Sequence, residues 1–133
     1  MQLETTMRDY LANAFDDACN AGGTDNGYIV FAEETTAEAA LATCEAATTM
    51  FNASASGAIT LDTGTAVEDT NTSAGDIGNC YIYNGNDEKV ASLGCHTTGT
   101  PDITVSSLTL GAGETMTVTS LTITVAAGTI DDS

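Results

Sequence analysis

The fold of this chain is decided by residues 80–93, which run Cys80-Tyr81-Ile82-Tyr83, then Asn84-Gly85-Asn86-Asp87, then Lys89-Val90-Ala91-Ser92-Leu93. The outer segments are predicted as strands, because each is a short run with strand-like composition. The Asn-Gly dipeptide between them tolerates the positive φ angles that tight turns require. Residues 80–93 therefore predict a β-hairpin.

Two further strands are expected after this hairpin, over 103–110 and 115–125, joined by a turn at 111–114. Pro101 precedes the first of them, where its missing N–H costs little. Apolar residues of the second strand change parity near Thr119-Ser120, from Met116 and Val118 to Leu121, Ile123 and Val125. This change predicts a β-bulge, or a strand that bends from one sheet to the other.

The region before the hairpin also predicts short strands. Residues 28–32 have the β-branched and aromatic content of a buried strand, and 58–61 form another. Between them we expect a strand near 39–44, although alanine propensity favours a helix there, and a turn at 52–57 after the apolar pair Met50-Phe51. Residues 62–79 have little apolar content and are expected to form an exposed excursion. This regular series of strands and turns predicts a mainly β fold, a β-sandwich or jelly roll.

One amphipathic α-helix is predicted over residues 3–18, because apolar residues recur there at three- and four-residue intervals: Leu3, Met7, Tyr10, Leu11, Ala14, Phe15 and Ala18. Asn20 with Gly22-Gly23 provides the stop signal. We expect the apolar stripe to cover one end or face of the chain's own sheet. Docking of the stripe on a neighbouring subunit is the alternative.

The charge of the chain restricts its partners. It has 19 Asp and Glu residues against two cations, Arg8 and Lys89, for a formal net charge of −17. Such a surface repels phosphate backbones and anionic membranes, so we expect a protein partner, no nucleic acid and no membrane. The 42% of apolar residues are too many for a disordered acidic tail. We expect one domain over residues 1–133, with the helix over 3–18, a β-sandwich over 28–125 and an acidic tail over 126–133.

The N-terminal residues 1–7 have neither a basic region nor an apolar run, which argues against a secretory signal. Synthesis in a cytoplasm is therefore expected. The four cysteines, Cys19, Cys44, Cys80 and Cys95, have no paired Cys-x-x-Cys spacing and one histidine to accompany them, so no zinc site is expected. They are predicted as buried thiols. A pair formed by Cys80 and Cys95, placed diagonally across the hairpin, is the alternative.

Several segments follow one another in a fixed order over most of the chain: the N-terminal helix, residues 28–31, residues 41–43, Met50-Phe51 with Ala53, Ser54 and Gly57, the hairpin around 81–85, and a closing block over 110–125. In this order they resemble small Thr- and Gly-rich virion structural proteins of tailed bacteriophages, and the closing block is the most specific part. The resemblance implies a structural protein of the virion, made in the host cytoplasm. Its implied role is a capsid decoration (cement) protein that binds the major capsid protein as a homotrimer or other homo-oligomer. A neck or tail component is the alternative within this class.

No catalytic or cofactor site is predicted. His96 follows Cys95, but neighbouring strand residues point to opposite faces, so we expect a solvent-facing histidine in the 94–101 loop. The carboxylate pairs Glu33-Glu34, Glu68-Asp69 and Asp131-Asp132 are interpreted as solvated surface. An alternative from another class is a calcium-binding extracellular β-sandwich module, with oxygen ligands from Asp62, Glu68, Asp69 and Asp76. Their spacing does not match an EF-hand loop, and no metal is assigned.

Overall fold

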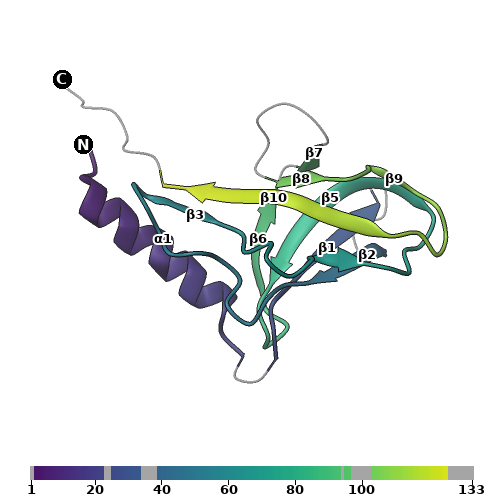
Figure 1. The fold of residues 1–133 in the computed structure, drawn as a ribbon, viewed down its shortest axis with the longest axis horizontal. Coiled ribbons are helices and arrows are strands. Elements are labelled where there is room, and N and C mark those ends of the chain that lie inside the picture. The colour runs from purple at the N-terminus through teal and green to yellow at the C-terminus, as the bar shows by residue number, and fades with distance from the viewer. Residues whose placement is uncertain (1, 23–24, 34–38, 94, 97–102, 126–133) are drawn as a thin grey trace.

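A computed structural model describes residues 2–22, 25–33, 39–93, 95–96 and 103–125. The structure is mainly β, with two sheets and one N-terminal helix, α1 (Thr5–Cys19). This confirms the β-sandwich-like fold predicted from the sequence (Figure 1). The Pro101 position and the acidic tail at 126–133 lie outside the described residues.

The first sheet has the order β2-β1-β5-β6, with the short β9 pairing with β5. Its strands are β1 (Tyr28–Glu33), β2 (Ala40–Glu45), β5 (Gly75–Tyr83), β6 (Lys89–Leu93) and β9 (Thr109–Leu110). All of its pairings are antiparallel. The strand predicted near 39–44 therefore exists, and the helical alternative for that segment is wrong.

The second sheet has the order β3-β10-β8-β7, with β4 pairing with β10. Its strands are β3 (Ala58–Thr60), β4 (Glu68–Asp69), β7 (Cys95–His96), β8 (Ile103–Val105) and β10 (Met116–Thr124). β7 pairs with β8 in parallel, and the other pairings are antiparallel. The register of β10 against β8 shifts between Val118 and Ser120, which confirms the predicted bulge.

The core lies between the two sheets. Alternate residues of the strands point inward, as the period of two requires. The first sheet contributes Ile29, Phe31, Cys44, Cys80 and Ile82, and the second contributes Ile103, Val105, Met116, Val118 and Leu121. All of these side chains are buried.

The hairpin over residues 80–93 is confirmed, but its turn is built differently from the prediction. The positive φ lies at Asp87 (61°) rather than in the Asn-Gly dipeptide. The Asn84 side-chain Oδ1 accepts hydrogen bonds from the backbone N–H groups of Asn86 and Glu88, at 3.0 and 3.1 Å. The buried asparagine side chain thus holds the turn in place of a left-handed Asn-Gly pair.

The predicted exposed excursion at 62–79 is wrong from Val67 onward. It contains β4 and the first part of β5, and it buries Val67, Thr72 and Ile77. Thr72 is fastened to the turn at 111–114, because its Oγ1 donates to the Gly111 oxygen at 2.9 Å and its own backbone oxygen accepts from Gly113 N–H at 2.7 Å. These buried side chains are too sparse to show a strand or helix period, which explains why the sequence did not predict their burial.

The single strand predicted over 103–110 is also wrong. β8 pairs with β10 in the second sheet, whereas β9 pairs with β5 in the first. Between them the chain crosses from one sheet to the other, and Ser106 N–H donates to Thr117 O on one side while Leu108 O accepts from Ile77 N–H on the other.

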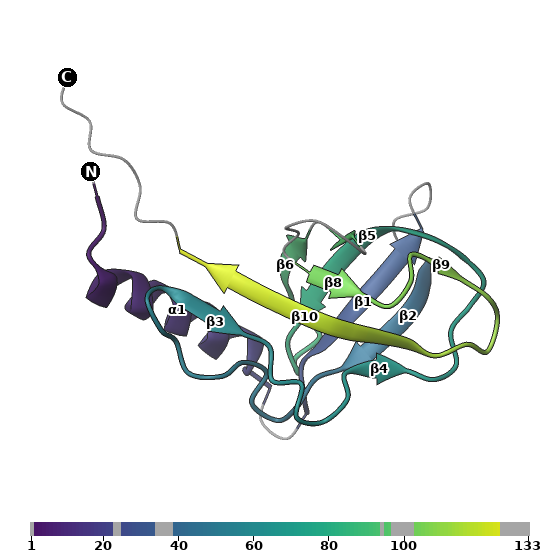
Figure 2. The ribbon, with the colours of Figure 1, turned by 45° about the horizontal axis from the view of Figure 1, so that its top comes forward.

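The C-terminal part of β10 extends beyond the sandwich together with β3, and α1 lies alongside this extension (Figures 1 and 2). We call α1, the turn 55–57, β3 and the β10 residues that pair with β3 (122–124) the arm. In the arm, Thr60 pairs with Thr122 and Ala58 pairs with Thr124. The arm places the helix at one end of an elongated molecule (Figures 1 and 2).

Candidate partner-binding surface

The start of α1 rests on the tight turn that leads into β3. Ser56 and Gly57 both have positive φ, 52° and 79°, and Ala55 and Ala58 exchange backbone hydrogen bonds at 2.9 and 3.0 Å. This two-residue turn between bridged residues matches the turn predicted at 52–57. A Cβ at Gly57 would lie 2.7 Å from the Arg8 Cβ, so the helix approaches as closely as a glycine allows.

Polar contacts fix the helix to this turn. The Gly57 backbone N–H donates to Asp9 Oδ1 at 2.7 Å. The Arg8 guanidinium donates to the Ser56 backbone oxygen at 3.3 Å and to Thr5 Oγ1 at 3.1 Å. The charged side chains of Arg8 and Asp9 therefore both make hydrogen bonds within the arm.

The end of α1 is held by its C-cap residue Asn20. Its Oδ1 accepts from Met50 N–H and its Nδ2 donates to Asp16 Oδ1, both at 2.8 Å. Phe15 packs edge-on against Phe51 with ring centroids 6.1 Å apart. Burial raises the pKa of Asp16, and the hydrogen bond from Asn20 opposes part of that rise. The helix is thus fixed at both ends.

Five of the seven residues in the predicted apolar stripe face solvent, whereas Phe15 packs against the core and Leu3 is half-buried. Met7, Tyr10 and Leu11 are exposed, at 47%, 65% and 44% of their surface, and Ala14 and Ala18 are exposed as well. These five residues recur at three- and four-residue spacing and so share one face. We call them the outer stripe.

The side of α1 that packs against the chain is a second, smaller line of residues. Ala12 and Cys19 are fully buried, and Phe15 packs against the core. The expectation that Met7, Tyr10 and Leu11 cover the chain's own sheet is therefore wrong. The packed side is marked in the sequence by Ala12, Phe15 and Cys19, which recur at three- and four-residue spacing as the outer stripe does.

The borders of the outer stripe are acidic. Glu4 lies at the start of the helix and Asp17 in its last turn, and both are exposed. The last turn, all of which the structure describes, has no basic residue. Of the two cations, Arg8 is bonded within the arm, and Lys89 Nζ lies 4.0 Å from the Tyr81 ring centroid on the first sheet. An apolar face with a negative border is the result.

The surface around Lys89 is an aromatic cluster on the first sheet. The rings of Tyr28 and Tyr83 stack with centroids 5.2 Å apart, and Lys89 Nζ lies 6.0 Å from the Tyr83 centroid. The Tyr28 hydroxyl donates to Asp87 Oδ1 at 2.8 Å. Desolvation and this neighbouring carboxylate raise the pKa of Tyr28 to about 12. These side chains pack against one another across neighbouring strands, and Lys89 makes its cation–π contact within this cluster.

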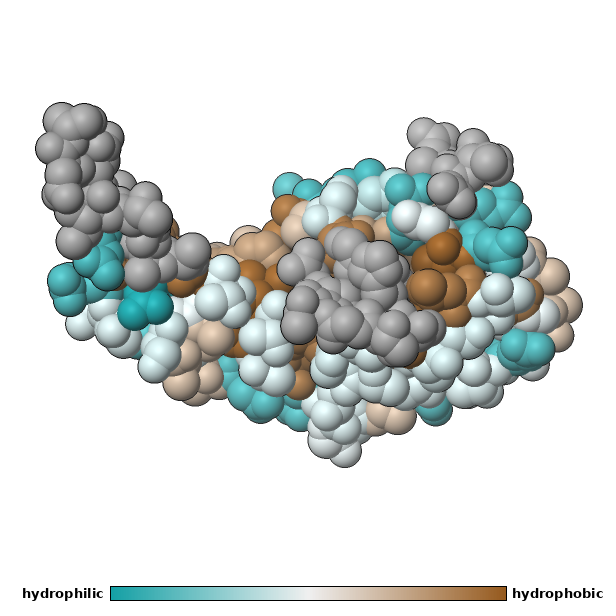
Figure 3. Space-filling model, turned by 90° about the horizontal axis from the view of Figure 1, so that it is seen from above, coloured by the Kyte–Doolittle hydropathy of each residue, from teal (hydrophilic) through white to brown (hydrophobic). Residues whose placement is uncertain are grey.

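Figure 3 shows the molecule from above, the side on which β10 lies in Figure 1. Hydrophobic side chains form two groups near the middle of this face, one of them over the sandwich, and hydrophilic side chains are frequent at the end that carries the helix. Ile123 and Val125, near the end of β10, are half-buried apolar residues packed against the core.

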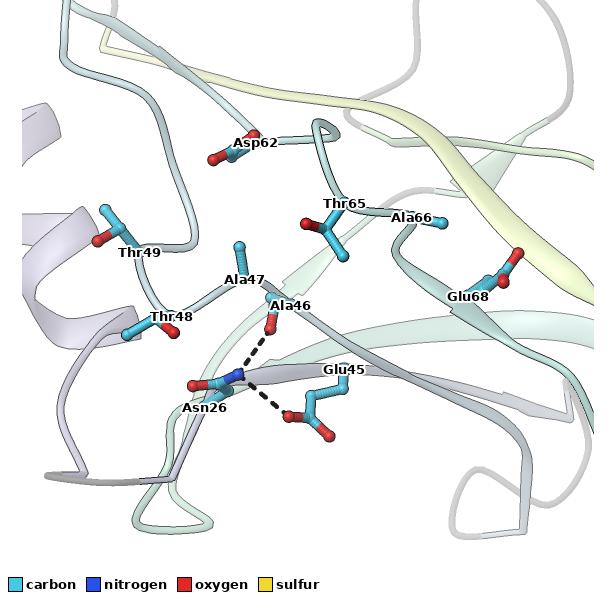
Figure 4. Close-up of a pocket in the computed structure, with 10 residues that line it drawn as sticks. All are labelled: Asn26, Glu45, Ala46, Ala47, Thr48, Thr49, Asp62, Thr65, Ala66 and Glu68. Atoms are coloured by element: carbon cyan, nitrogen blue, oxygen red, sulfur yellow. Dashed lines mark hydrogen bonds between the residues drawn. The ribbon is translucent and has the colours of Figure 1, made fainter.

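An open cleft of about 590 Å³ lies between the segments 45–49 and 62–68 (Figure 4). Three carboxylates line it, Glu45, Asp62 and Glu68, on different sides of the cleft. Each has a local hydrogen bond: from Asn26 Nδ2 to Glu45 at 3.1 Å, from Gly64 N–H to Asp62 at 2.9 Å, and from Thr117 Oγ1 to Glu68 at 3.3 Å. These three hydrogen bonds stabilise turns and strand edges, so each carboxylate has a structural partner within the chain.

The four candidate calcium ligands take separate structural roles. Asp69 accepts from the backbone N–H groups of Thr43 and Asn71, both at 2.9 Å, and Asp76 accepts from Thr109 Oγ1 at 3.0 Å. Among the described residues, no three His, Cys, Asp or Glu side chains gather where they could hold a metal ion. Asp69 instead covers the open edge of β2.

Glu68 and Asp69, the carboxylate pair inside the described region, bond to different neighbours, Thr117 on one side and Thr43 on the other. The carboxylates of Glu68 and Asp69 therefore do not point at a common position where they could act together. Glu34, Asp131 and Asp132 lie outside the described residues, as do the side chains of Cys95 and His96. The backbone of 95–96 forms β7 rather than the loop expected there.

Cys19, Cys44 and Cys80 are buried, as predicted. Burial raises the pKa of Cys19 and of Cys44 to about 12, which suppresses their thiolate forms. The Cys44 Sγ lies 3.8 Å from the Met116 oxygen in the other sheet. Because β7 pairs with β8, the backbone of Cys95 belongs to the second sheet rather than to an extension of the hairpin.

Compared with known proteins, the chain matches no family model, no curated protein and no solved structure at a significant level. In the part of the chain that the structure describes, no helix has the length and apolarity to cross a membrane.

Proposed function

We propose that this chain is a non-enzymatic structural protein of a tailed-bacteriophage virion, and specifically a capsid decoration protein. In this role it is made in the host cytoplasm and binds the outer lattice of the major capsid protein as a homotrimer or other homo-oligomer. Its fold class and the order of its segments, which resemble small phage virion proteins, support the proposal.

The observation that carries the proposal is the outer stripe of α1. A helix held rigidly at both ends presents three large apolar side chains to solvent. Exposed apolar faces with polar borders are typical of protein-binding surfaces. The fold thus holds a preorganised docking element at the end of the arm.

Charge and contact strength fit a protein that covers a repeating lattice. The formal net charge of −17 keeps free copies apart before assembly. Completing the burial of three half-exposed side chains contributes about 1 kcal/mol each, so one contact is weak by itself. Repetition of that contact in an oligomer on a lattice multiplies the effective affinity.

The proposal is tested by counting copies in purified particles of the virus that encodes the chain. Quantitative mass spectrometry is expected to find it in a fixed, simple ratio to the major capsid protein. Brief protease treatment of intact particles is expected to remove it before the capsid protein, because it lies outside. A few copies per particle would support the neck or tail alternative, and absence from the particle would refute a virion role.

A further inference from the structure

We infer that the outer stripe of α1 (Met7, Tyr10, Leu11, Ala14 and Ala18) docks into an apolar groove of the shell protein whose rim carries lysine and arginine. This inference rests on the proposed function for the identity of the partner. It adds the surface that makes the contact and the chemistry of the surface that receives it.

The geometry of α1 fits a helix-in-groove contact. In this mode an amphipathic helix places residues at three- and four-residue spacing into an apolar groove. Three members of the outer stripe are large and 44–65% exposed, while the alanines at 14 and 18 let a partner approach the last turns closely. Because hydrogen bonds at both ends of the helix fix it to the rest of the chain, little ordering is needed on binding.

Charge selects the partner. Glu4 and Asp17 border the stripe, and both cations of the chain are already engaged, Arg8 with Ser56 and Lys89 with Tyr81. Within the described ranges, no lysine or arginine of this chain is therefore left to meet these carboxylates. A rim of lysine and arginine on the partner supplies the complementary charge, which orients the encounter and speeds it.

The same argument disfavours a second copy as the occupant. Helix-to-helix contact through the stripe would bring together the Glu4 and Asp17 carboxylates of two chains that each carry a formal charge of −17. The area that the outer stripe can bury against a second copy is also too small, because a stable interface buries about 800 Å² on each partner. One stripe of three large residues and two alanines on a helix of 15 residues provides less than that. A deeper groove on a larger partner can enclose the helix on both flanks.

The test uses virus particles from which the gene for this chain has been deleted, mixed with purified chain and separated by sedimentation. Met7→Gln/Leu11→Gln removes two large stripe residues while keeping good helix formers. We expect about a 30-fold loss of affinity for the particles, from the lost burial of two side chains. Asn13→Gln, an exposed polar position on the same helix, is the matched control and is expected to bind like the wild type.

The charge of the rim is tested with a second pair of variants. Glu4→Gln/Asp17→Asn is expected to weaken binding several-fold and to flatten its dependence on NaCl. The equal-charge control changes two exposed acids away from the helix, Asp25→Asn with Glu114→Gln, and is expected to keep the wild-type salt dependence. Wild-type binding itself is expected to weaken as NaCl rises, because salt screens opposite charges.

The outcomes separate the inference from the proposed function. Wild-type chain that binds the particles while Met7→Gln/Leu11→Gln binds equally well overturns the stripe contact and leaves the decoration role standing. Wild-type chain that does not bind overturns both. Self-association that strengthens with NaCl and is lost in Met7→Gln/Leu11→Gln identifies a second copy as the occupant and overturns the basic groove.

Discussion

Replacing Gly57 with alanine tests how the arm holds the helix. Gly57 has φ of +79°, and a Cβ there would lie 2.7 Å from the Arg8 Cβ and 3.1 Å from the Val125 oxygen. An alanine in the left-handed region costs about 1–2 kcal/mol. The collision is with a Cβ fixed to the helix backbone, so the start of α1 must move. That movement weakens the hydrogen bond from the Gly57 N–H to Asp9, and bonds to charged groups contribute about 1.5–3 kcal/mol.

The expected total is a loss of about 3 kcal/mol in the free energy of unfolding, measured by urea denaturation. Gly113→Ala is the matched control, because Gly113 also has a positive φ, of 74°, but a Cβ there would meet nothing closer than Asn71 Oδ1 at 3.8 Å. It is expected to cost about 1–2 kcal/mol, the backbone cost alone. Hydrogen exchange of the α1 amides is expected to accelerate in Gly57→Ala and not in Gly113→Ala. Equal losses in the two variants, with α1 equally protected, would refute this account of the arm.

Three more predictions concern charge, thiols and pH. Raising NaCl from about 0.1 to 1 M is expected to raise the melting temperature, because it screens the repulsion within a chain of net charge −17; a falling melting temperature would contradict it. Cys19 and Cys44 are expected to react with a thiol reagent much more slowly in the folded chain than after denaturation, since burial raises their pKa from 9.0 to about 12 and shields the sulfur atoms; peptide mapping of the label measures each site, and equal rates would argue against their burial. Asp16 has a raised pKa in the folded chain, so its contribution to stability is full below pH 3.8 and is lost as pH rises through the folded value. Asp16→Asn, which keeps an acceptor for Asn20, is expected to remove this part of the pH dependence of the unfolding free energy, and an unchanged pH profile would count against it.

The longer strands were predictable from their β-branched and aromatic composition, whereas the two-residue strands β4, β7 and β9 were not. The change of parity between Val118 and Leu121 even located the bulge in β10. Sparse buried residues were not predictable, since Val67, Thr72 and Ile77 lie in a segment of Gly, Asp, Asn and Thr and are buried by contacts with distant parts of the chain.

The candidate surface was only half predictable. Apolar spacing found all five residues of the outer stripe, but it grouped them with Phe15, which packs against the core, and did not predict that they face solvent. The larger side chains, Met7 and Leu11, favour the interior on hydrophobicity alone, yet the helix buries Ala12 and Cys19 and packs Phe15 against the core. Tertiary geometry, which depends on a turn far from the helix in sequence, overrides the local pattern.

The central claim is that this chain acts by docking, through the exposed face of a helix held on a rigid arm. The most direct measurement is a cryo-electron microscopy map of the intact virus particle at side-chain resolution. The account predicts density for this chain on the outer lattice, with Met7, Tyr10 and Leu11 enclosed by the shell protein and basic residues beside Glu4 and Asp17. Density in which α1 points away from the shell, with its apolar face still in solvent, would contradict the claim.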